Sequence, residues 1–317
     1  MATTDIEWAT HVWNFTRGCR RVSPGCGGPL GEGGCYAEKI AYRFSGPGMP
    51  YAGLVTLGAN GPRWTGKGLF LPDRLDYPLH VRAPREGSSL RFFVNSMSDL
   101  FFEEFANEQI GAAFGVMAAC REHDFLILTK RPERMLKWFQ WAAHQQRYAG
   151  AEPSPSEVMQ CIASDLFRVK LDGIEERPWP LPNVWLGVSV ENQKAAEERI
   201  PLLLKTPAAI RFISAEPLLG EVHLWAFLKG EVRDRSLEAP GSAPYRGLNW
   251  VIVGSESGPR ARKMELEWAR RIVDDCRVAG VPVFVKQIAN EHDRKGGDPR
   301  HWPDGDWPRE FPEVRNG

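Results

Sequence analysis

The chain has 317 residues, and its 40 Lys and Arg residues balance 40 Asp and Glu residues, so the formal net charge is zero. This length suits one large domain or two small ones with a sizeable core. Zero net charge excludes a global positive field that would draw the whole protein onto nucleic acid or a membrane, whereas a local basic patch stays compatible with it.

No apolar run reaches the length of a bilayer span, and the N-terminal "MATTDIEWATHVWNF" lacks the basic and apolar regions of a signal peptide. We therefore expect a cytoplasmic protein without a membrane partner. In a reducing cytoplasm, clustered thiols favour a metal site or a redox site over a disulfide framework.

A cysteine-rich loop follows the first predicted strand. The strand lies near Thr10–Gly18 and leads into "GCRRVSPGCGGPLGEGGCYAEK", which holds Cys19, Cys26 and Cys35, and a helix begins at Tyr36. The other three cysteines are scattered along the chain. Two of them lie near the ends of apolar helices and are interpreted as small buried hydrophobes.

Beyond this loop, short apolar runs alternate with amphipathic helical patterns. Near-continuous hydrophobicity is typical of strands that are covered on both faces, as in a parallel sheet. The alternation predicts an α/β fold, a partial or complete βα-barrel of six or seven parallel strands, with a doubly wound open sheet as the alternative. The predicted strands occupy 90–99, 124–132, 183–192, 209–217, 249–257 and 281–289, and the helical patterns occupy 36–44, 107–123, 132–147, 193–205 and 264–280.

Three stretches interrupt the alternation, at about 46–86, 148–182 and 229–247. The first is rich in Gly, Pro and aromatic residues and is interpreted as an excursion over the mouth of the barrel. We expect one βα-barrel over 1–290. The tail at 291–317 contains Trp and Phe residues, which predict that it packs on the barrel.

Polar residues follow each predicted strand, and in βα-barrels the active site lies at the C-terminal ends of the strands. A single Ser or Asn at such a place is more often the N-cap of the next helix. Charged residues directly after buried strands need partners or a ligand, and parallel neighbouring strands bring them to one mouth. The strand-end residues are Asn95, Ser96, Ser98, Asp99, Thr129, Lys130, Arg131, Ser189, Glu191, Asn192, Ser214, Glu216, Ser255, Glu256, Ser257, Lys286 and Gln287.

Several basic residues near the predicted mouth have two interpretations. They are favoured as solvated charges at helix starts, and contacts to phosphates are the alternative. These residues are Arg131, Arg134, Arg260, Arg262 and Lys263.

Three soft thiolates on the same rim suit zinc or an iron–sulfur cluster. Structural zinc usually takes four ligands, and the nearest histidine, His11, precedes the strand. A [4Fe–4S] cluster held by three thiolates leaves one iron open, so the residue types favour iron–sulfur over zinc. Three unliganded thiols together would oxidise, which disfavours a loop without a metal.

The loop and the motifs after it resemble the radical SAM (S-adenosyl-L-methionine) superfamily and, more closely, an uncharacterised family of radical SAM-like proteins common in phages and prophages. The resemblance covers nearly the whole chain, from about Ile6 to Gln287. It rests on "WNFTRGC", "SPGC", "CYAEK", "FVNSMSDLF", "LTKRP", "WLGVSVEN", "RFISAEPLLG", "WVIVGSESG" and "FVKQ".

One departure concerns the spacing of the cysteines. The superfamily usually reads C-x3-C-x2-C, whereas here "GGPLGEGG" separates Cys26 from Cys35. A Gly-rich insertion of this kind can loop out and leave the sulfurs where they were. Loss of the cluster or a different metal is the other interpretation.

The resemblance implies that Cys19, Cys26 and Cys35 each bind one iron of a [4Fe–4S] cluster, whose fourth iron chelates S-adenosyl-L-methionine. Around the cofactor it implies a place for Tyr36 beside the cluster and adenine. The arrangement looks similar to that of spore photoproduct lyase, a DNA-repair enzyme. The resemblance further implies contacts to SAM and to the substrate. The SAM amino group would be held by Ser96, Ser98 or Asp99, the SAM carboxylate by Lys130, and the ribose by Ser189 and Glu191. The residues that would face the substrate are Glu216, Glu256, Lys286 and Gln287.

The implied chemistry is reductive cleavage of SAM to methionine and a 5′-deoxyadenosyl radical, which abstracts a hydrogen atom from the substrate. The implied partners are an external one-electron donor of the flavodoxin or ferredoxin type and a small-molecule or nucleic-acid substrate, such as a nucleotide or base in phage DNA modification or repair. The alternative from another class is a non-catalytic binding protein stapled by zinc or a cluster. A protein that cycles a disulfide ranks last, because the cysteines form no C-x-x-C pair.

Overall fold

Seven β-strands form one sheet in the computed structural model, and they are ordered along it as they are in the chain. Most of their residues are apolar, and apart from the first strand, where two of three residues are half-buried, they are mostly buried on both faces, as parallel strands between covering layers require. The strands of this sheet are β1 (His11–Trp13), β6 (Leu90–Val94), β7 (His123–Thr129), β8 (Val184–Ser189), β9 (Ile210–Ala215), β10 (Trp250–Gly254) and β11 (Val283–Gln287).

The strand order distinguishes between the two folds that the sequence allowed. The order β1-β6-β7-β8-β9-β10-β11 contains no reversal, whereas a doubly wound sheet reverses at a switch point. The pairs β1–β6, β6–β7, β9–β10 and β10–β11 are parallel. Within the described residues β1 and β11 are the two end strands of this sheet, so the order is that of a partial βα-barrel.

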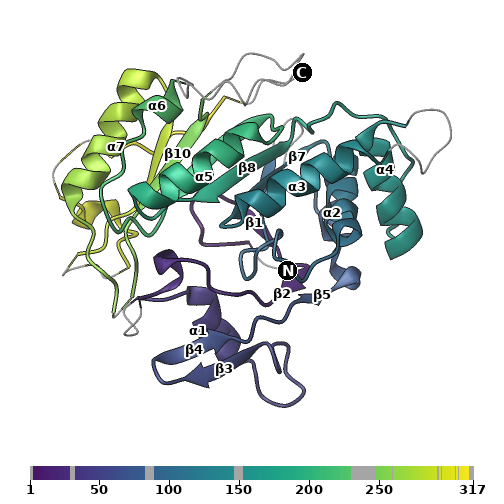
Figure 1. The fold of residues 1–317 in the computed structure, drawn as a ribbon, viewed down its shortest axis with the longest axis horizontal. Helices are drawn as coiled ribbons and strands as arrows, with labels where there is room; N and C mark the ends of the chain where they lie inside the picture. Colours follow the sequence, from purple (N-terminus) through teal and green to yellow (C-terminus); the bar gives the residue numbers. More distant parts are fainter. Residues whose placement is uncertain are drawn as a thin grey trace. The chain divides into compact units, whose positions relative to one another are not determined.

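The structure describes residues 3–28, 33–82, 89–145, 153–229, 247–258, 260–290, 293, 295–303, 305 and 307–313. The chain divides into two compact units. Unit 1 comprises 1–21, 37–186 and 206–209, and unit 2 comprises 22–36, 187–205 and 210–317. One boundary between the units falls within β8, and another falls at the start of the first helix; Figure 1 labels both elements, β8 and α1.

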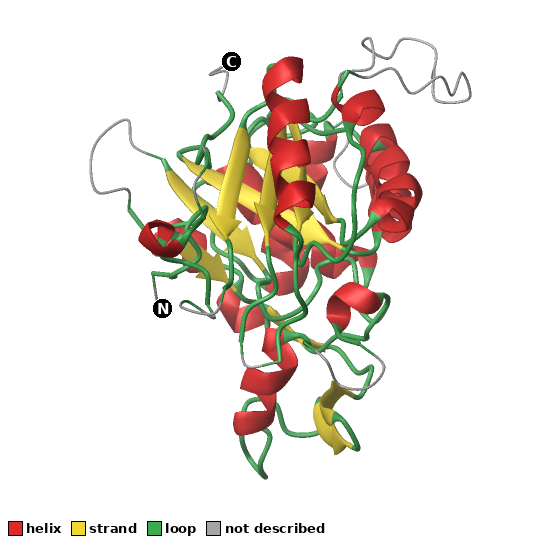
Figure 2. Cartoon of the chain, turned by 90° about the vertical axis from the view of Figure 1, so that its left-hand side faces the viewer, coloured by secondary structure: helices red, strands yellow, loops and turns green. Residues whose placement is uncertain are grey.

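The helices follow the strands, and all five helical patterns of the sequence form helices. Figure 2 shows several helices, in red, beside the yellow strands of the sheet. Gly280 ends the last long helix in the left-handed conformation (φ 68°), which glycine adopts without strain. The helices are α1 (Tyr36–Arg43), α2 (Asn107–Ala119), α3 (Pro132–Ala143), α4 (Pro155–Cys161), α5 (Gln193–Lys205), α6 (Trp225–Leu228) and α7 (Leu266–Ala279), with a π-helical turn, η4 (Ile162–Leu166), after α4.

Unit 1 has an aromatic core between β1, β6 and β7. The Phe92 and Phe125 rings stack with centroids 5.4 Å apart, and the Trp13 ring lies 5.6 Å from Phe125. Rings of this size dominate core energetics because each buries a large apolar area. On the helical side, α2 packs closely on α4, where a side chain at Gly115 would lie 2.2 Å from the Met159 carbonyl oxygen.

The stretch at 46–86 forms small elements of its own. A hairpin joins β3 (Val55–Gly58) to β4 (Gly61–Trp64), and β5 (Leu69–Phe70) pairs with β2 (Thr16–Arg17). In Figure 1 the hairpin lies beside α1, and the Trp64 amide donates to Glu38 of that helix over 3.1 Å. Two 3-10 turns follow, η2 (Pro72–Arg74) and η3 (Tyr77–His80).

The C-terminal segment packs on unit 2. The Val285 amide donates to the Pro308 carbonyl, and the Trp250 indole donates to the Glu310 carbonyl over 2.8 Å. The Phe311 ring lies 5.4 Å from that of Trp250. These contacts cover the outer edge of β11, which would otherwise expose unpaired backbone groups. A 3-10 turn, η6 (Pro299–His301), precedes them.

Most of the expected insertion at 229–247 lies outside the described residues. The end of the insertion at 46–86 and the start of the one at 148–182 also lie outside them, because 83–88 and 146–152 are not described. In the described part of the chain, no helix combines the length and the apolar composition that crossing a bilayer requires.

Candidate functional site

Cys26 and Cys35, the second and third cysteines of the predicted metal site, lie together at the ends of one loop of unit 2. A 3-10 turn, η1 (Pro24–Cys26), carries the first, and the Cys35 amide donates to the Cys26 carbonyl over 3.2 Å. This hydrogen bond closes the loop across the "GGPLGEGG" insertion. Both thiols are partly exposed. The widened spacing therefore leaves the two cysteine backbones in contact.

Glu256, at the end of β10, holds this loop from within unit 2. Its carboxylate accepts hydrogen bonds from the Arg262 guanidinium at 2.8 and 2.9 Å and from the Gly34 amide at 3.1 Å. Arg262 also donates to the Pro24 carbonyl over 2.8 Å. A side chain at Gly33 would overlap the Glu256 carboxylate, and Gly33 has a φ of 59°, so glycine is required there.

The charge of Glu256 is stabilised by these donors. Burial by itself would raise the pKa of this carboxyl, but the hydrogen bonds from Arg262 and Gly34 outweigh burial, and the net pKa lies below its ordinary value. A carboxylate that stays ionised and is filled by donors is suited to anchor a loop. It is poorly suited to exchange protons with a substrate.

Two further predicted residues of unit 2 form an ion pair. The Lys286 ammonium donates to the Glu216 carboxylate over 2.9 Å, and the Ser214 hydroxyl donates to the same carboxylate over 3.1 Å. The side chains of Glu216 and Lys286 are 13% and 21% exposed, so this pair is reachable from solvent. Beside it, the Gln287 side chain donates to the Ser255 carbonyl and ties β11 to β10.

Glu191 is buried in unit 2 and is fully engaged. Arg199 of α5 donates to its two oxygens at 2.8 and 3.2 Å, and donates to the Ser189 carbonyl over 2.7 Å. The Glu191 and Arg199 side chains are 1% and 8% exposed. A ligand that used Glu191 would have to displace a buried guanidinium, which is costly.

Unit 1 contains a separate polar cluster at the ends of β6 and β7, centred on Arg131. Its guanidinium donates to Asp99 over 3.0 Å and to Glu103 over 3.1 Å. The Thr129 hydroxyl donates to Asp99 over 2.7 Å, and the Lys130 amide donates to it over 3.2 Å. These hydrogen bonds therefore join the segment at the end of β7 to Asp99, in the loop that follows β6.

Arg131 also reaches the first cysteine. It donates to the Cys19 sulfur over 3.7 Å and to the Arg20 carbonyl over 2.9 Å. Although burial opposes charge on the guanidinium, Asp99, Cys19 and Glu103 together raise the pKa of Arg131 above its ordinary value. Arg131 is 6% exposed. The prediction that Arg131 is a solvated charge is therefore wrong, because its side chain is buried.

The serines and the lysine of the predicted cofactor site also lie in unit 1. The Ser96 hydroxyl bonds to Asn14, and the Ser98 hydroxyl bonds to the Thr16 carbonyl over 3.2 Å. The Lys130 side chain is partly exposed. Beside them, Asn95 is 2% exposed and has a φ of 57°.

Only one of the two polar atoms of the Asn95 side-chain amide has a hydrogen-bond partner in the described part of the chain. Its oxygen accepts from the Thr16 amide over 3.3 Å, whereas its nitrogen has no partner in the described part of the chain. A buried donor without an acceptor is costly and needs an explanation. Asn95 is thus a strand-end residue with a spare donor in a strained backbone conformation.

The predicted metal ligands are divided between the units. Cys19 belongs to unit 1, and Cys26, Cys35 and Tyr36 belong to unit 2. Tyr36 is 51% exposed at the start of α1. In the part of the chain that is described, no three His, Cys, Asp or Glu side chains gather as a metal site. The three-cysteine site stays a prediction.

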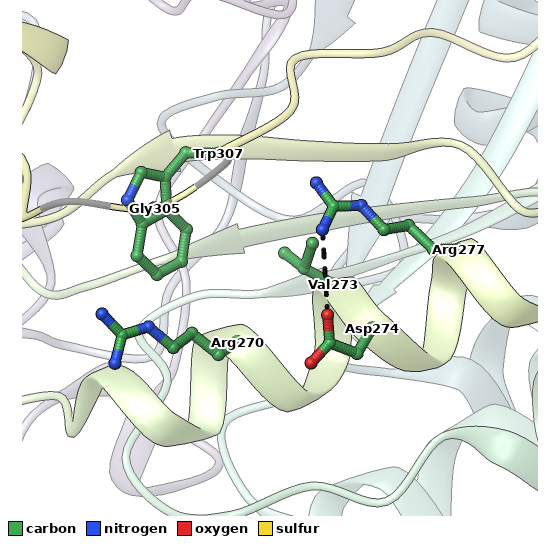
Figure 3. A pocket seen from close by; sticks show the side chains of 6 residues that line it. All are labelled: Arg270, Val273, Asp274, Arg277, Gly305 and Trp307. Carbon is green, nitrogen blue, oxygen red and sulfur yellow. Dashed lines mark ion pairs between the residues drawn. The ribbon is translucent and has the colours of Figure 1, made fainter.

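A shallow surface hollow of about 160 Å³ lies elsewhere on unit 2 (Figure 3). It is lined by α7 and the C-terminal segment, with the Arg270 guanidinium 5.8 Å from the Trp307 ring centroid. Arg277 pairs there with Asp274 over 3.8 Å. None of the predicted site residues lines this hollow.

Sequence reasoning did not identify Arg199, and it interpreted Arg131 and Arg262 as solvated charges or phosphate contacts instead of as the partners of Asp99 and Glu256. Arg199 had a signal, because it lies on the apolar face of α5 between Ala195 and Leu203, where a charge needs a buried partner. Arg131 is next to the predicted Lys130. Arg262 lies in a loop without periodicity, so no pattern marks its role.

Comparison with protein families decides the membership of this chain. Residues 3–304 match the model of the family described as "Protein of unknown function (DUF5131)". The chain belongs to this family. Among curated proteins and among solved structures, the same kind of comparison found no match.

Proposed function

We propose that this DUF5131 member is a radical SAM enzyme that carries a [4Fe–4S] cluster on Cys19, Cys26 and Cys35. The observation that carries the proposal is the closure of the cysteine loop: the Cys35 amide bonds to the Cys26 carbonyl, and Glu256 and Arg262 brace the loop at the end of β10. Three thiols are the donor set that such a cluster takes. The likeness of the sequence motifs to the superfamily supports the same assignment.

When bound, the cluster and S-adenosyl-L-methionine would supply a one-electron reduction and a 5′-deoxyadenosyl radical. The chain would supply positions and charges. Asn95 offers a spare buried donor beside Ser96 and Ser98, which fits an acceptor such as a carboxylate. Lys130 offers an ammonium at the end of β7. The substrate would be a small molecule or a nucleic-acid base, and the electron donor a flavodoxin or ferredoxin.

Among the residues predicted to face substrate, the Glu216–Lys286 pair best suits that role. Both side chains retain exposure; Glu216 accepts hydrogen bonds from Lys286 and Ser214, and Lys286 donates to Glu216. Glu256 and Gln287 bind the protein's own backbone instead. We therefore assign substrate contact to Glu216 and Lys286, and a positioning role to Glu256 and Gln287.

A second candidate is a non-catalytic binding protein in which zinc or a cluster only staples the loop. One observation favours it. Glu191, Glu216 and Glu256 each pair with a cation of the same unit, so these strand-end charges do not require a ligand. In a protein whose metal only stabilises the loop, these ion pairs would have a structural role alone.

Anaerobic purification and reconstitution distinguish the two candidates. Iron, sulfide and zinc are quantified, and then SAM and dithionite are added and 5′-deoxyadenosine is measured. About four irons per chain with SAM cleavage would support the enzyme. Stoichiometric zinc without iron would support the staple and refute the enzyme.

The ligands are tested with alanine variants of Cys19, Cys26 and Cys35, each compared with Cys161→Ala. Cys161 is a partly exposed cysteine at the end of α4 and serves as a matched control. Each ligand variant is expected to lose most of its iron, and the control to keep it. Normal iron in all three variants would contradict the ligand assignment.

A further inference from the structure

The charge of the chain is unevenly distributed, and one basic stretch lies in unit 1. Residues 39–72 contain no Asp or Glu, although one residue in eight of the chain is acidic (40 of 317). The same stretch contains Lys39, Arg43, Arg63 and Lys67. It covers most of α1, the β3–β4 hairpin and β5. Net neutrality of the whole chain therefore conceals a local positive surface.

Three carboxylates border this stretch, fewer than its four cations: Glu38 before it, Asp73 after it and the exposed Glu104 beside Gly68. Glu38 is 1% exposed and is occupied by Arg21, by the Trp64 amide and, at 3.9 Å, by Arg63. Arg20 and Lys67 are exposed, and in the described part of the chain neither side chain pairs with a carboxylate. These cations are available to an external anion.

Tyr51 connects the cations to a group of aromatic side chains. Its amide donates to the Phe44 carbonyl over 3.0 Å, its ring centroid lies 6.3 Å from that of Trp64, and the Arg17 guanidinium lies 5.1 Å from it. The Arg20 guanidinium lies against Gly66, next in the chain to Lys67. We call this surface the Tyr51 face. It consists of Arg17, Arg20, Phe44, Tyr51, Trp64 and Lys67.

Arg74, a cation outside this face, repels Arg17. Burial first, and then the nearby positive charge of Arg74, lower the pKa of Arg17. Binding of an anion would relieve this repulsion. Phe44, whose carbonyl accepts a hydrogen bond from the Tyr51 amide, is 48% exposed, so its aromatic ring is in contact with water. A ligand that combines phosphate charges with flat apolar rings would satisfy both features.

We propose that the Tyr51 face binds single-stranded nucleic acid, with phosphates on Arg17, Arg20 and Lys67 and an unstacked base on Phe44. Proteins that bind single strands combine a basic surface with aromatic platforms in this way. A duplex buries its base faces and offers nothing to stack on Phe44. The inference deepens the proposed function by naming its substrate class, but the binding itself needs neither cluster nor SAM.

The test uses the full chain and a fluorescein-labelled, mixed-sequence 20-nucleotide DNA, with binding followed by fluorescence anisotropy. The expected result at 50 mM NaCl is saturable binding that is at least tenfold tighter than binding of the matched 20-base-pair duplex. Affinity should fall with salt, with a log–log slope of about −2 for three phosphate contacts on a single strand. No binding at 100 µM protein would overturn the proposal.

A charge-reversal pair tests the location. Arg20→Glu with Lys67→Glu should weaken binding at least tenfold and reduce the magnitude of the salt slope by about 1.4. The control pair, Lys194→Glu with Arg277→Glu, makes the same charge change on exposed helix positions of unit 2. Equal weakening by the control pair would show that only net charge matters and would overturn the assigned face.

Phe44 tests the stacking contribution. Phe44→Ala should weaken binding about tenfold, and Phe44→Trp should restore it, because base stacking depends on the aromatic ring. Unchanged binding by Phe44→Ala together with equally tight duplex binding would refute single-strand recognition. The measurements are repeated on Cys26→Ala protein. DNA binding without iron supports the inference even if the enzyme proposal fails, and a cluster with SAM cleavage but no DNA binding refutes the inference alone.

Discussion

Arg131 in unit 1 and Glu256 in unit 2 each hold a cysteine-bearing segment, but their charges are opposite. Arg131 places a cation within 3.7 Å of the Cys19 sulfur, and Asp99 and Glu103 balance that cation. Glu256 contacts the backbone of the Cys26–Cys35 loop through Gly34, and Arg262 balances it. The cation acts on a sulfur atom, whereas the carboxylate fixes the shape of a loop.

The difference suggests a division of roles between the two centres. A guanidinium next to a thiol favours its thiolate form, which is the form that binds metals. A carboxylate next to thiols would disfavour that form, but Glu256 is directed at amide groups and at Arg262 instead. Replacing each central residue should therefore affect different properties, and this can be measured.

The largest expected effect is that of Arg131→Ala on stability. Arg131 and Asp99 are both buried, so the variant leaves a buried carboxylate without its cation, at a cost of about 3–5 kcal/mol in the free energy of unfolding. The measurement is urea denaturation. Glu103→Ala is the control, because the Glu103 side chain is 57% exposed and its pair with Arg131 should contribute less than about 1 kcal/mol. Equal losses in both variants would contradict a buried centre at Asp99.

A smaller loss is expected for Glu256→Gln, about 1–3 kcal/mol, because an amide cannot hold two guanidinium donors and two amides as a carboxylate does. The loop should also open more often. Alkylation of Cys26 and Cys35 by iodoacetamide, followed by mass spectrometry, should therefore become faster than in the parent protein. Glu265→Gln removes an exposed pair with Lys263 and should change neither quantity.

The strands and the positions of the strand-end residues were predictable, and the partners of those residues were not. Near-continuous apolar runs define buried parallel strands, so the ends of β6, β7 and β10 could be read from the sequence. Which cation meets which carboxylate depends on how loops return to the sheet. Arg262 is six residues beyond Glu256 in a loop without periodicity. No local sequence pattern predicts that this loop brings Arg262 back to the Glu256 carboxylate.

The segment between Cys26 and Cys35 illustrates what spacing can and cannot predict. Glycines allow a loop between the two cysteines, and the Cys35 amide donates to the Cys26 carbonyl. The reason that glycine stands at Gly33 is tertiary, because the Glu256 carboxylate occupies the place of its side chain. The spacing of the cysteines and glycines does not predict that Gly33 packs against Glu256.

The third prediction concerns pH and again distinguishes the two centres. The folded-state pKa of Glu256 lies below its ordinary value of 4.5, so its contribution to stability is complete above about pH 4.5 and is lost as the pH falls through the lowered folded pKa. The stability difference between the parent protein and Glu256→Gln should therefore shrink on acidification from pH 7 to pH 3. Urea denaturation at several pH values measures it. A difference that is constant with pH would show that the charge of Glu256 does not matter.

The smallest effect is expected for Arg131→Lys on the reactivity of Cys19. The lysine keeps a positive charge for Asp99, but one ammonium cannot replace a planar group that serves Asp99, Glu103, the Arg20 carbonyl and the Cys19 sulfur together. Losing the contact to the sulfur should slow alkylation of Cys19 by roughly threefold, which is what a weak hydrogen bond of somewhat under 1 kcal/mol contributes. Cys26 belongs to unit 2 and serves as the internal reference in the same mass-spectrometric experiment. If Cys19 and Cys26 slow equally, the cause is general. If only Cys19 slows, the guanidinium of Arg131 acts on that sulfur directly, as the comparison of the two centres requires.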